Sequence, residues 1–113
     1  IFAGGGITPR LFGGVNLPGY DTGVAYDYTT MDAPWADTLA HYDEVAVVAW
    51  SYGVPAAARF ITDHPELPFT ARIAVNGTMH PVDAERGIAP EIFAGTVAWL
   101  DERALRKCNM RMW

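Results

Sequence analysis

The sequence has almost no cysteine, no long apolar run and no excess of basic charge, and each absence excludes a class of protein. The single cysteine, Cys108, rules out an internal disulfide and fits a reducing compartment. No apolar run approaches the ~20 residues that span a bilayer. Neither the charged n-region nor the leading apolar h-region of a secretory signal is present. The net charge of −5 argues against a general nucleic-acid binder. We therefore expect a cytoplasmic protein with neither membrane nor nucleic-acid partners.

The chain holds enough apolar residues for one folded domain. Half of its 113 residues are hydrophobic and 12% are aromatic, which argues against disorder. Residues 1–79 carry eight acidic and three basic side chains, whereas residues 80–113 carry five of each. The chain lacks an initiator methionine and ends within an amphipathic stretch, so we interpret it as an internal fragment of a longer protein.

The stretch from Val45 to Arg59 organises the rest of the chain. Its Val/Ala-rich first part is typical of a strand buried on both faces of a parallel sheet, and an alanine-rich helix pattern follows at once. The junction, Ala49-Trp50-Ser51-Tyr52-Gly53, matches the G-x-S-x-G nucleophile elbow of serine acyl hydrolases, with alanine in place of the first glycine. Such a turn would raise Ser51 Oγ above the sheet edge, beside a helix N-terminus that stabilises negative charge. An ordinary buried turn serine is the alternative.

A glycine loop follows the apolar start of the chain. Gly4-Gly5-Gly6 comes directly after Ile1-Phe2-Ala3, which is typical of a strand end. Successive glycines let the backbone approach a ligand closely, and a loop after an early strand supplies one oxyanion N–H in serine hydrolases. A phosphate-binding loop is disfavoured because neither G-x-G-x-x-G nor a G-K-[ST] ending is present. A flexible turn remains an alternative.

Strand and helix patterns alternate along the chain, which predicts the α/β fold class with a mostly parallel sheet. Strands are predicted over 1–3, 23–28, 45–50 and 71–75, and helices over about 8–13, 34–42 (with Asp32 as N-cap), 52–62, 90–100 and 102–113. The last two helices follow the final strand and are amphipathic. We therefore expect a core over residues 1–79 and a helical cap or lid segment over residues 80–113.

Several segments match one family in order. They are IFAGGG at 1–6, YDY at 26–28, VAWSYGV at 48–54, AVNGT at 74–78, PVDAERGI at 81–88, PEIF at 90–93 and RKCNMRM at 106–112. With these segments the chain resembles the N-terminal part of the BioG-type pimeloyl-[acyl-carrier protein] methyl ester esterases, which are α/β-hydrolases of biotin synthesis. The match covers nearly the whole chain, and its Ala-Trp-Ser-x-Gly-Val form is more specific than a generic elbow.

The resemblance implies a partial α/β-hydrolase fold in which Ser51 is the nucleophile and the backbone N–H groups of Gly5 and Tyr52 form the oxyanion hole. It implies an acyl carrier protein bearing a pimeloyl methyl ester as partner, with no cofactor and no metal. The family often has tryptophan at the position of Gly5, so glycine keeps the donor but removes an apolar wall. The family's acid and histidine lie beyond residue 113. We therefore expect that the C-terminal part of the hydrolase domain is absent and that the fragment alone is inactive.

The chain's own histidines are poor substitutes for the missing base. His41 precedes the central predicted strand and His64 follows the helix after it, so both should lie at the sheet edge opposite Ser51. His80 follows a strand and is the one geometric candidate, although an ordinary polar residue at the cap entrance is favoured. Asp83 and Glu85, in the same loop, are interpreted as solvated charges rather than as a triad acid.

The last predicted helix carries a cluster of basic residues at i, i+3, i+4 and i+8, namely Arg103, Arg106, Lys107 and Arg111. Such a face could steer and hold an acidic acyl carrier protein. A solvated helix face is an equally good explanation. Two further functions also remain open: another acyl-ester or thioester hydrolase on the same scaffold, and a catalytically inactive α/β-hydrolase-like binding domain.

Overall fold

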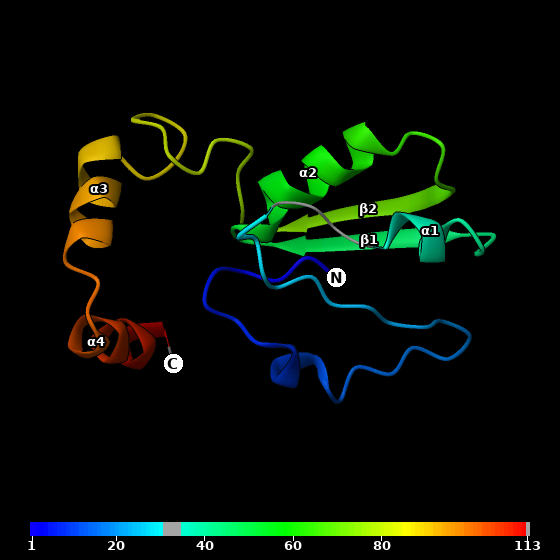
Figure 1. Ribbon diagram of the computed structural model, residues 1–113, viewed down its shortest axis with the longest axis horizontal. Coiled ribbons are helices and arrows are strands. Elements are labelled where there is room, and N and C mark those ends of the chain that lie inside the picture. The colour runs from blue at the N-terminus through cyan, green and yellow to red at the C-terminus, as the bar shows by residue number, and fades with distance from the viewer. Residues whose placement is uncertain (31–34, 113) are drawn as a thin grey trace. The chain divides into compact units, whose positions relative to one another are not determined.

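The computed structural model describes residues 1–30 and 35–112, without the side chains of residues 108, 109, 111 and 112. The chain divides into two compact units, residues 1–79 and residues 80–113, and each is described by itself below. Asp32, the expected N-cap, and Trp113, the last residue of the final predicted helix, lie outside the described residues. Figure 1 shows the order of the elements along the chain.

The centre of the first unit is a parallel pair of strands joined by a helix. Strand β1 (Val45–Trp50) pairs in parallel with β2 (Phe69–Val75), and helix α2 (Gly53–Asp63) connects them. Val45, Val47 and Ala49 are buried on the face of β1 that packs on the core. The expectation of a strand buried on both faces is wrong, because Ala46 is exposed and Val48 and Trp50 are only half-buried. In Figure 1, α2 lies along this pair of strands. The result is a small parallel sheet with flanking helices, compatible with a partial α/β fold.

Phe2 extends the parallel pairing on the other side of β1. It forms isolated parallel bridges with both Ala49 and Ala25, so the spatial order is Ala25, Phe2, β1, β2. The N–H of Phe2 donates to the carbonyl of Val48 at 2.8 Å, and the N–H of Trp50 donates to the carbonyl of Phe2 at 2.9 Å. The strand predicted over 23–28 is wrong in extent, because pairing there is reduced to one bridge.

Apolar side chains from these segments form one core. Its buried members are Phe2, Val45, Val47, Ala49, Val54, Ala56, Ala57, Phe60 and Leu67. The rings of Phe2 and Phe60 lie 5.7 Å apart and link the first segment of the chain to α2. The N-terminal segment is therefore held to β1 by backbone hydrogen bonds and to α2 by ring packing.

The remaining helices of the first unit are short. A 3₁₀ helix spans Pro9–Phe12, as expected, but the helix predicted over 34–42 is only the four-residue α1 (Ala36–Leu39). The longer helix was predicted from Asp32 as N-cap and Pro34 in the first turn, and such start signals do not fix how far a short helix continues. His41, two residues after the end of α1, lies in a turn before β1.

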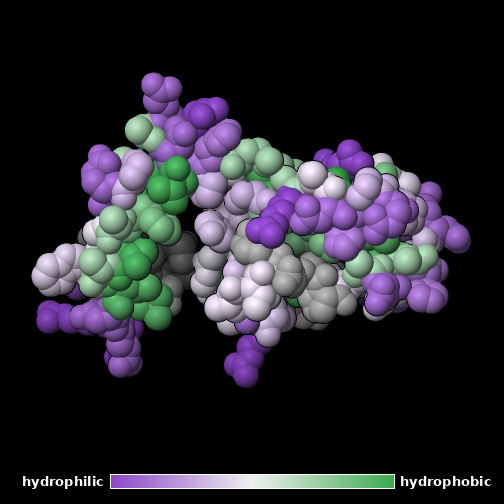
Figure 2. Space-filling view, turned by 45° about the horizontal axis from the view of Figure 1, so that its top comes forward, coloured by the Kyte–Doolittle hydropathy of each residue, from purple (hydrophilic) through white to green (hydrophobic). Residues whose placement is uncertain are grey.

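The second unit contains two helices after an irregular loop. Helix α3 spans Pro90–Ala98, with the proline in its first turn, and α4 spans Glu102–Met112. Asp101 caps α4, because its Oδ1 accepts the N–H of Ala104 at 2.6 Å. No residue of α3 is buried, and apolar side chains from this unit form the green area over the helices in Figure 2. Within the described part of the chain, no helix is long and apolar enough to cross a membrane.

Candidate active site

Ser51 occupies a strained turn between a strand and a helix. It follows the last residue of β1, and α2 begins two residues later, at Gly53. The φ angle of Ser51 is +55°, a left-handed conformation that serine adopts rarely and at a cost of about 1–3 kcal/mol. Both sides of the turn are fixed, since its N–H donates to the carbonyl of Val75 at 3.0 Å and its carbonyl accepts the N–H of Val54 at 3.1 Å. A strained serine at a strand-to-helix turn is the geometry of a nucleophile elbow.

Two glycines make this turn possible by leaving room for neighbouring backbone. A Cβ at Gly53 would lie 2.2 Å from the carbonyl oxygen of Phe2, and a Cβ at Gly77 would lie 2.5 Å from that of Ser51. Because both carbonyl oxygens belong to the backbone, moving a flexible side chain cannot relieve these two contacts. The turn therefore requires glycine two residues after Ser51 for a steric reason that the motif alone only suggests.

The glycine loop passes directly beside the elbow. A Cβ built at Gly4 would lie 3.3 Å from Ser51 Cβ, and one at Gly5 would lie 3.9 Å from Tyr52 Cβ. Gly6 has a φ of +73°, a left-handed backbone conformation that favours glycine. Among the described residues, the N–H groups of Gly5 and Tyr52 donate to no backbone carbonyl. The structure thus brings together the serine and two backbone donors.

Sequence comparisons place this chain in a known family. The family model described as "Pimeloyl-ACP methyl esterase BioG" matches residues 1–113, the whole chain. The chain belongs to the BioG family. No solved structure matches it significantly.

Two curated relatives share its sequence over almost its whole length. A Bacteroides fragilis protein named malonyl-[acyl-carrier protein] O-methyltransferase is 41% identical over 112 residues, which are 99% of this chain and 22% of that protein. An uncharacterized Haemophilus influenzae protein is 34% identical over 112 residues, 98% of this chain and 50% of that protein. This BioG-family chain therefore spans half the length or less of these curated relatives.

Two of the three histidines of this BioG-family chain lie far from Ser51 along their elements. His41 precedes β1 and its Nδ1 lies 2.7 Å from the carbonyl oxygen of Asp37. His64 follows α2, where its ring lies 4.7 Å from Phe60 and its Nδ1 lies 3.1 Å from Glu66. Strand β1, which has six residues and is about 20 Å long, separates His41 from Ser51. Helix α2, which has eleven residues and is about 16 Å long, separates His64 from Ser51, so neither ring can take the serine proton. His80 belongs to the second unit.

The predicted carrier-docking residues belong to helix α4. The side chains of Arg103, Arg106 and Lys107 are exposed, whereas that of Arg111 lies outside the described side chains. The guanidinium of Arg106 pairs with Glu102 at 2.6 Å, with 75% and 80% of the two side chains exposed. Exposed pairs of this kind stabilise little and are readily exchanged for another carboxylate. The basic face is therefore partly neutralised by its own helix, which the i, i+3, i+4 spacing did not reveal.

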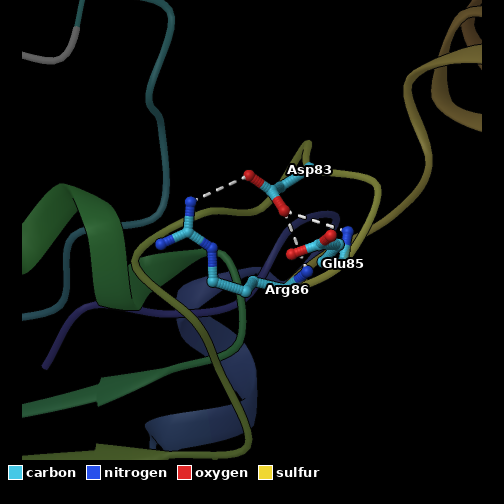
Figure 3. Close-up of polar contacts among 3 residues, drawn as sticks. All are labelled: Asp83, Glu85 and Arg86. Carbon is cyan, nitrogen blue, oxygen red and sulfur yellow. Dashed lines mark hydrogen bonds and ion pairs between the residues drawn. The ribbon is translucent and has the colours of Figure 1, made fainter.

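Asp83 is used to build a loop in the second unit. Its Oδ1 accepts the N–H groups of Glu85 and Arg86 at 3.0 and 2.9 Å, and its Oδ2 meets the Arg86 guanidinium at 3.3 Å (Figure 3). These backbone N–H donors, aided by the guanidinium, hold the pKa of Asp83 below its ordinary value. A Cβ at Gly87 would lie 2.0 Å from the carbonyl oxygen of His80, so the turn needs glycine. The carboxylate is thus fully engaged in the loop.

Tyr28 is a residue of this site that the sequence did not identify. Its hydroxyl donates to the carbonyl of Ala3, immediately before the glycine loop, at 2.7 Å. Its ring lies 5.9 Å from that of Tyr52, the residue after the serine. The YDY segment at 26–28 matches the family but assigns this tyrosine no role, because its contacts join three segments that are distant in sequence.

Proposed function

We propose that this chain supplies the nucleophile and the oxyanion hole of a serine carboxylester hydrolase. The observation that carries the proposal is the φ of +55° at Ser51, at a strand-to-helix turn beside the N–H groups of Gly5 and Tyr52, which donate to no backbone carbonyl of the described residues. A strained serine is retained only where the surroundings enforce it, and such residues are concentrated at functional sites. The family description adds the substrate class, a pimeloyl chain on acyl carrier protein that carries a methyl ester. The reaction would serve biotin synthesis.

In the proposed reaction Ser51 Oγ attacks the carbonyl carbon of the methyl ester. The C–O bond to Oγ forms, the carbonyl oxygen takes up negative charge, and the N–H groups of Gly5 and Tyr52 stabilise it together with the N-terminus of α2. Collapse of this intermediate breaks the bond to the methoxy group, which leaves as methanol. Water then attacks the acyl-serine and releases a free carboxylate with Ser51 restored. The base that takes the Oγ proton is expected beyond residue 113, with its orienting acid.

Turnover of the proposed substrate tests this function. The intact protein that contains this chain should convert pimeloyl-[acyl-carrier protein] methyl ester to the free acid with release of methanol, both measured by mass spectrometry. It should also rescue a biotin auxotroph that lacks its own esterase. Hydrolysis of other acyl esters or thioesters without this conversion would identify a different hydrolase on the same scaffold. Absence of all hydrolysis and of serine labelling would identify a binding domain.

The oxyanion role of Gly5 can be separated from its small size. We expect Gly5→Ala, which keeps the N–H and whose Cβ meets Tyr52 Cβ at an ordinary 3.9 Å, to leave kcat within about twofold. Gly5→Pro removes the N–H, and we expect kcat to fall about 100-fold. The measurement is ester hydrolysis by the intact protein, normalised to the fraction of serine that a fluorophosphonate labels. Equal effects of the two substitutions would contradict the donor role.

The basic residues of α4 are proposed to hold the acyl carrier protein. We expect the double substitution of Arg103 and Arg106 by glutamate to lower kcat/KM for the carrier-linked ester about tenfold, because it reverses charge on an exposed face. Hydrolysis of a small water-soluble ester should be unchanged. Added salt should reduce the difference. Arg59→Glu on α2, another exposed arginine with its own i, i+4 ion pair, to Asp63, is the matched control. Equal loss on both esters would refute the docking role.

A further inference from the structure

One hydroxyl group fixes the base of the glycine loop. Tyr28 Oη donates to the carbonyl oxygen of Ala3 at 2.7 Å and lies 3.1 Å from the carbonyl oxygen of Ala25. Ala3 has no exposed surface, so water cannot replace this hydrogen bond. Among the described residues, the Tyr28 hydroxyl is the donor found for the Ala3 carbonyl. The N–H of Ala3 is held as well, by the Ala25 carbonyl at 2.8 Å. The segment that leads into the loop is therefore fixed on both sides.

The same side chain contacts the elbow. The ring of Tyr28 packs against that of Tyr52 with centroids 5.9 Å apart and planes inclined at 54°. Ala3 lies two residues before Gly5, and Tyr52 carries the other N–H of the oxyanion pair. A single side chain thus connects the two segments whose backbone donors must point at one oxygen.

We propose that Tyr28 is a positioning residue of the oxyanion hole, which fixes the spacing of the Gly5 and Tyr52 N–H groups through its hydroxyl and its ring. The inference rests on the function proposed above. Oxyanion stabilisation depends on donors held in place before the charge develops, so a small displacement of one donor lowers kcat substantially. Tyr28 does not touch the reacting atoms and acts only through the two segments that it joins.

The hydroxyl works as a donor over the whole working range of pH. Partial burial raises the pKa of Tyr28 to about 12, so the proton stays on oxygen and remains available to the Ala3 carbonyl. The group therefore adds no ionisation to a pH–rate profile at neutral pH. Its removal should lower the rate by the same factor throughout that profile, which distinguishes it from a general base.

Tyr28→Phe in the intact protein isolates the hydroxyl, because the ring contact with Tyr52 is retained. We expect kcat per active site to fall about tenfold while KM for the ester stays within about twofold. The inhibition constant of an alkyl boronic acid, whose tetrahedral serine adduct occupies the oxyanion hole, should rise by about the same tenfold. Active sites are counted by complete labelling with a fluorophosphonate. Tyr26→Phe, the same chemical change at a side chain that is 49% exposed, should leave all three quantities unchanged.

The outcomes separate this inference from the function on which it rests. Failure of the unsubstituted protein to label or to hydrolyse any ester would overturn both. If Tyr28→Phe has fewer labelled sites but an unchanged kcat per labelled site, Tyr28 has a purely structural role. That result would overturn the inference alone. If Tyr28→Phe does not fold, Tyr52→Leu decides, because it removes the ring contact and keeps both N–H groups. An unchanged boronate inhibition constant in that variant would also overturn the inference.

Discussion

Replacing Ser51 by glycine is expected to abolish ester hydrolysis and at the same time to stabilise the protein. Loss of the nucleophile should lower kcat by about 10⁴-fold or more, because the remaining oxyanion hole and substrate binding cannot replace the acyl-serine step. Glycine adopts a φ of +55° without the penalty paid by serine, so the free energy of unfolding should rise by about 1 kcal/mol. Urea denaturation of the intact protein and a fluorogenic ester assay measure the two effects.

Ser51→Ala is the companion variant, since alanine removes the nucleophile but retains a Cβ in the strained conformation. It should be as inactive as Ser51→Gly and should gain no stability. Asn76→Gly controls for strain alone: Asn76 has a φ of +45° but asparagine tolerates this region, so activity should be kept with little change in stability. Ser51 is the chain's only serine, which makes the labelled peptide unambiguous within these residues. Residual hydrolysis or labelling of this segment in Ser51→Ala would contradict the assignment.

The elements with the strongest local patterns were predictable from sequence. The strand over 45–50 and the helix after it were expected within a residue of the bounds of β1 and α2. In both segments the secondary-structure propensity of the residues and the pattern of apolar residues predict the same element. The element over 71–75 is the last part of β2 (Phe69–Val75). For β1 and α2 the apolar pattern reflects contact with one core, whereas Ile73 and Val75 of β2 are exposed, so that strand was found by its strand-forming residues.

Elements held by contacts distant in sequence were not predictable in the same way. The strand predicted over 23–28 forms a single bridge, at Ala25. The extent of this pairing is set by its partner, Phe2, and not by residues 23–28 themselves. The role of Tyr28 follows from the fold alone, because its hydrogen bond spans 25 residues to Ala3. For the site, the motif located Ser51 and the glycine loop, whereas the strained φ and the steric need for glycine appear only in three dimensions. The roles of Gly5 and Tyr52 as oxyanion donors stay predictions.

Replacing Gly53 by alanine is expected to destabilise the protein more than any other glycine-to-alanine substitution at the elbow. The new Cβ would lie 2.2 Å from the carbonyl oxygen of Phe2 and 2.7 Å from that of Ala3, so the first segment must move away from α2. Overpacking against backbone that cannot yield should cost about 3 kcal/mol or more of the free energy of unfolding. The same movement would displace the glycine loop from Ser51, and activity should fall as well.

Gly95→Ala is the matched control for this substitution. Both glycines lie in helices, Gly53 at the start of α2 and Gly95 within α3, but a Cβ at Gly95 meets nothing within 4 Å. Helix propensity then acts alone, and alanine should raise the free energy of unfolding by about 0.5–1 kcal/mol. Opposite signs of the two effects in urea denaturation are the expected result. A neutral Gly53→Ala would mean that the N-terminal segment does not pass beneath α2, and the glycine loop would then lose its place beside the serine.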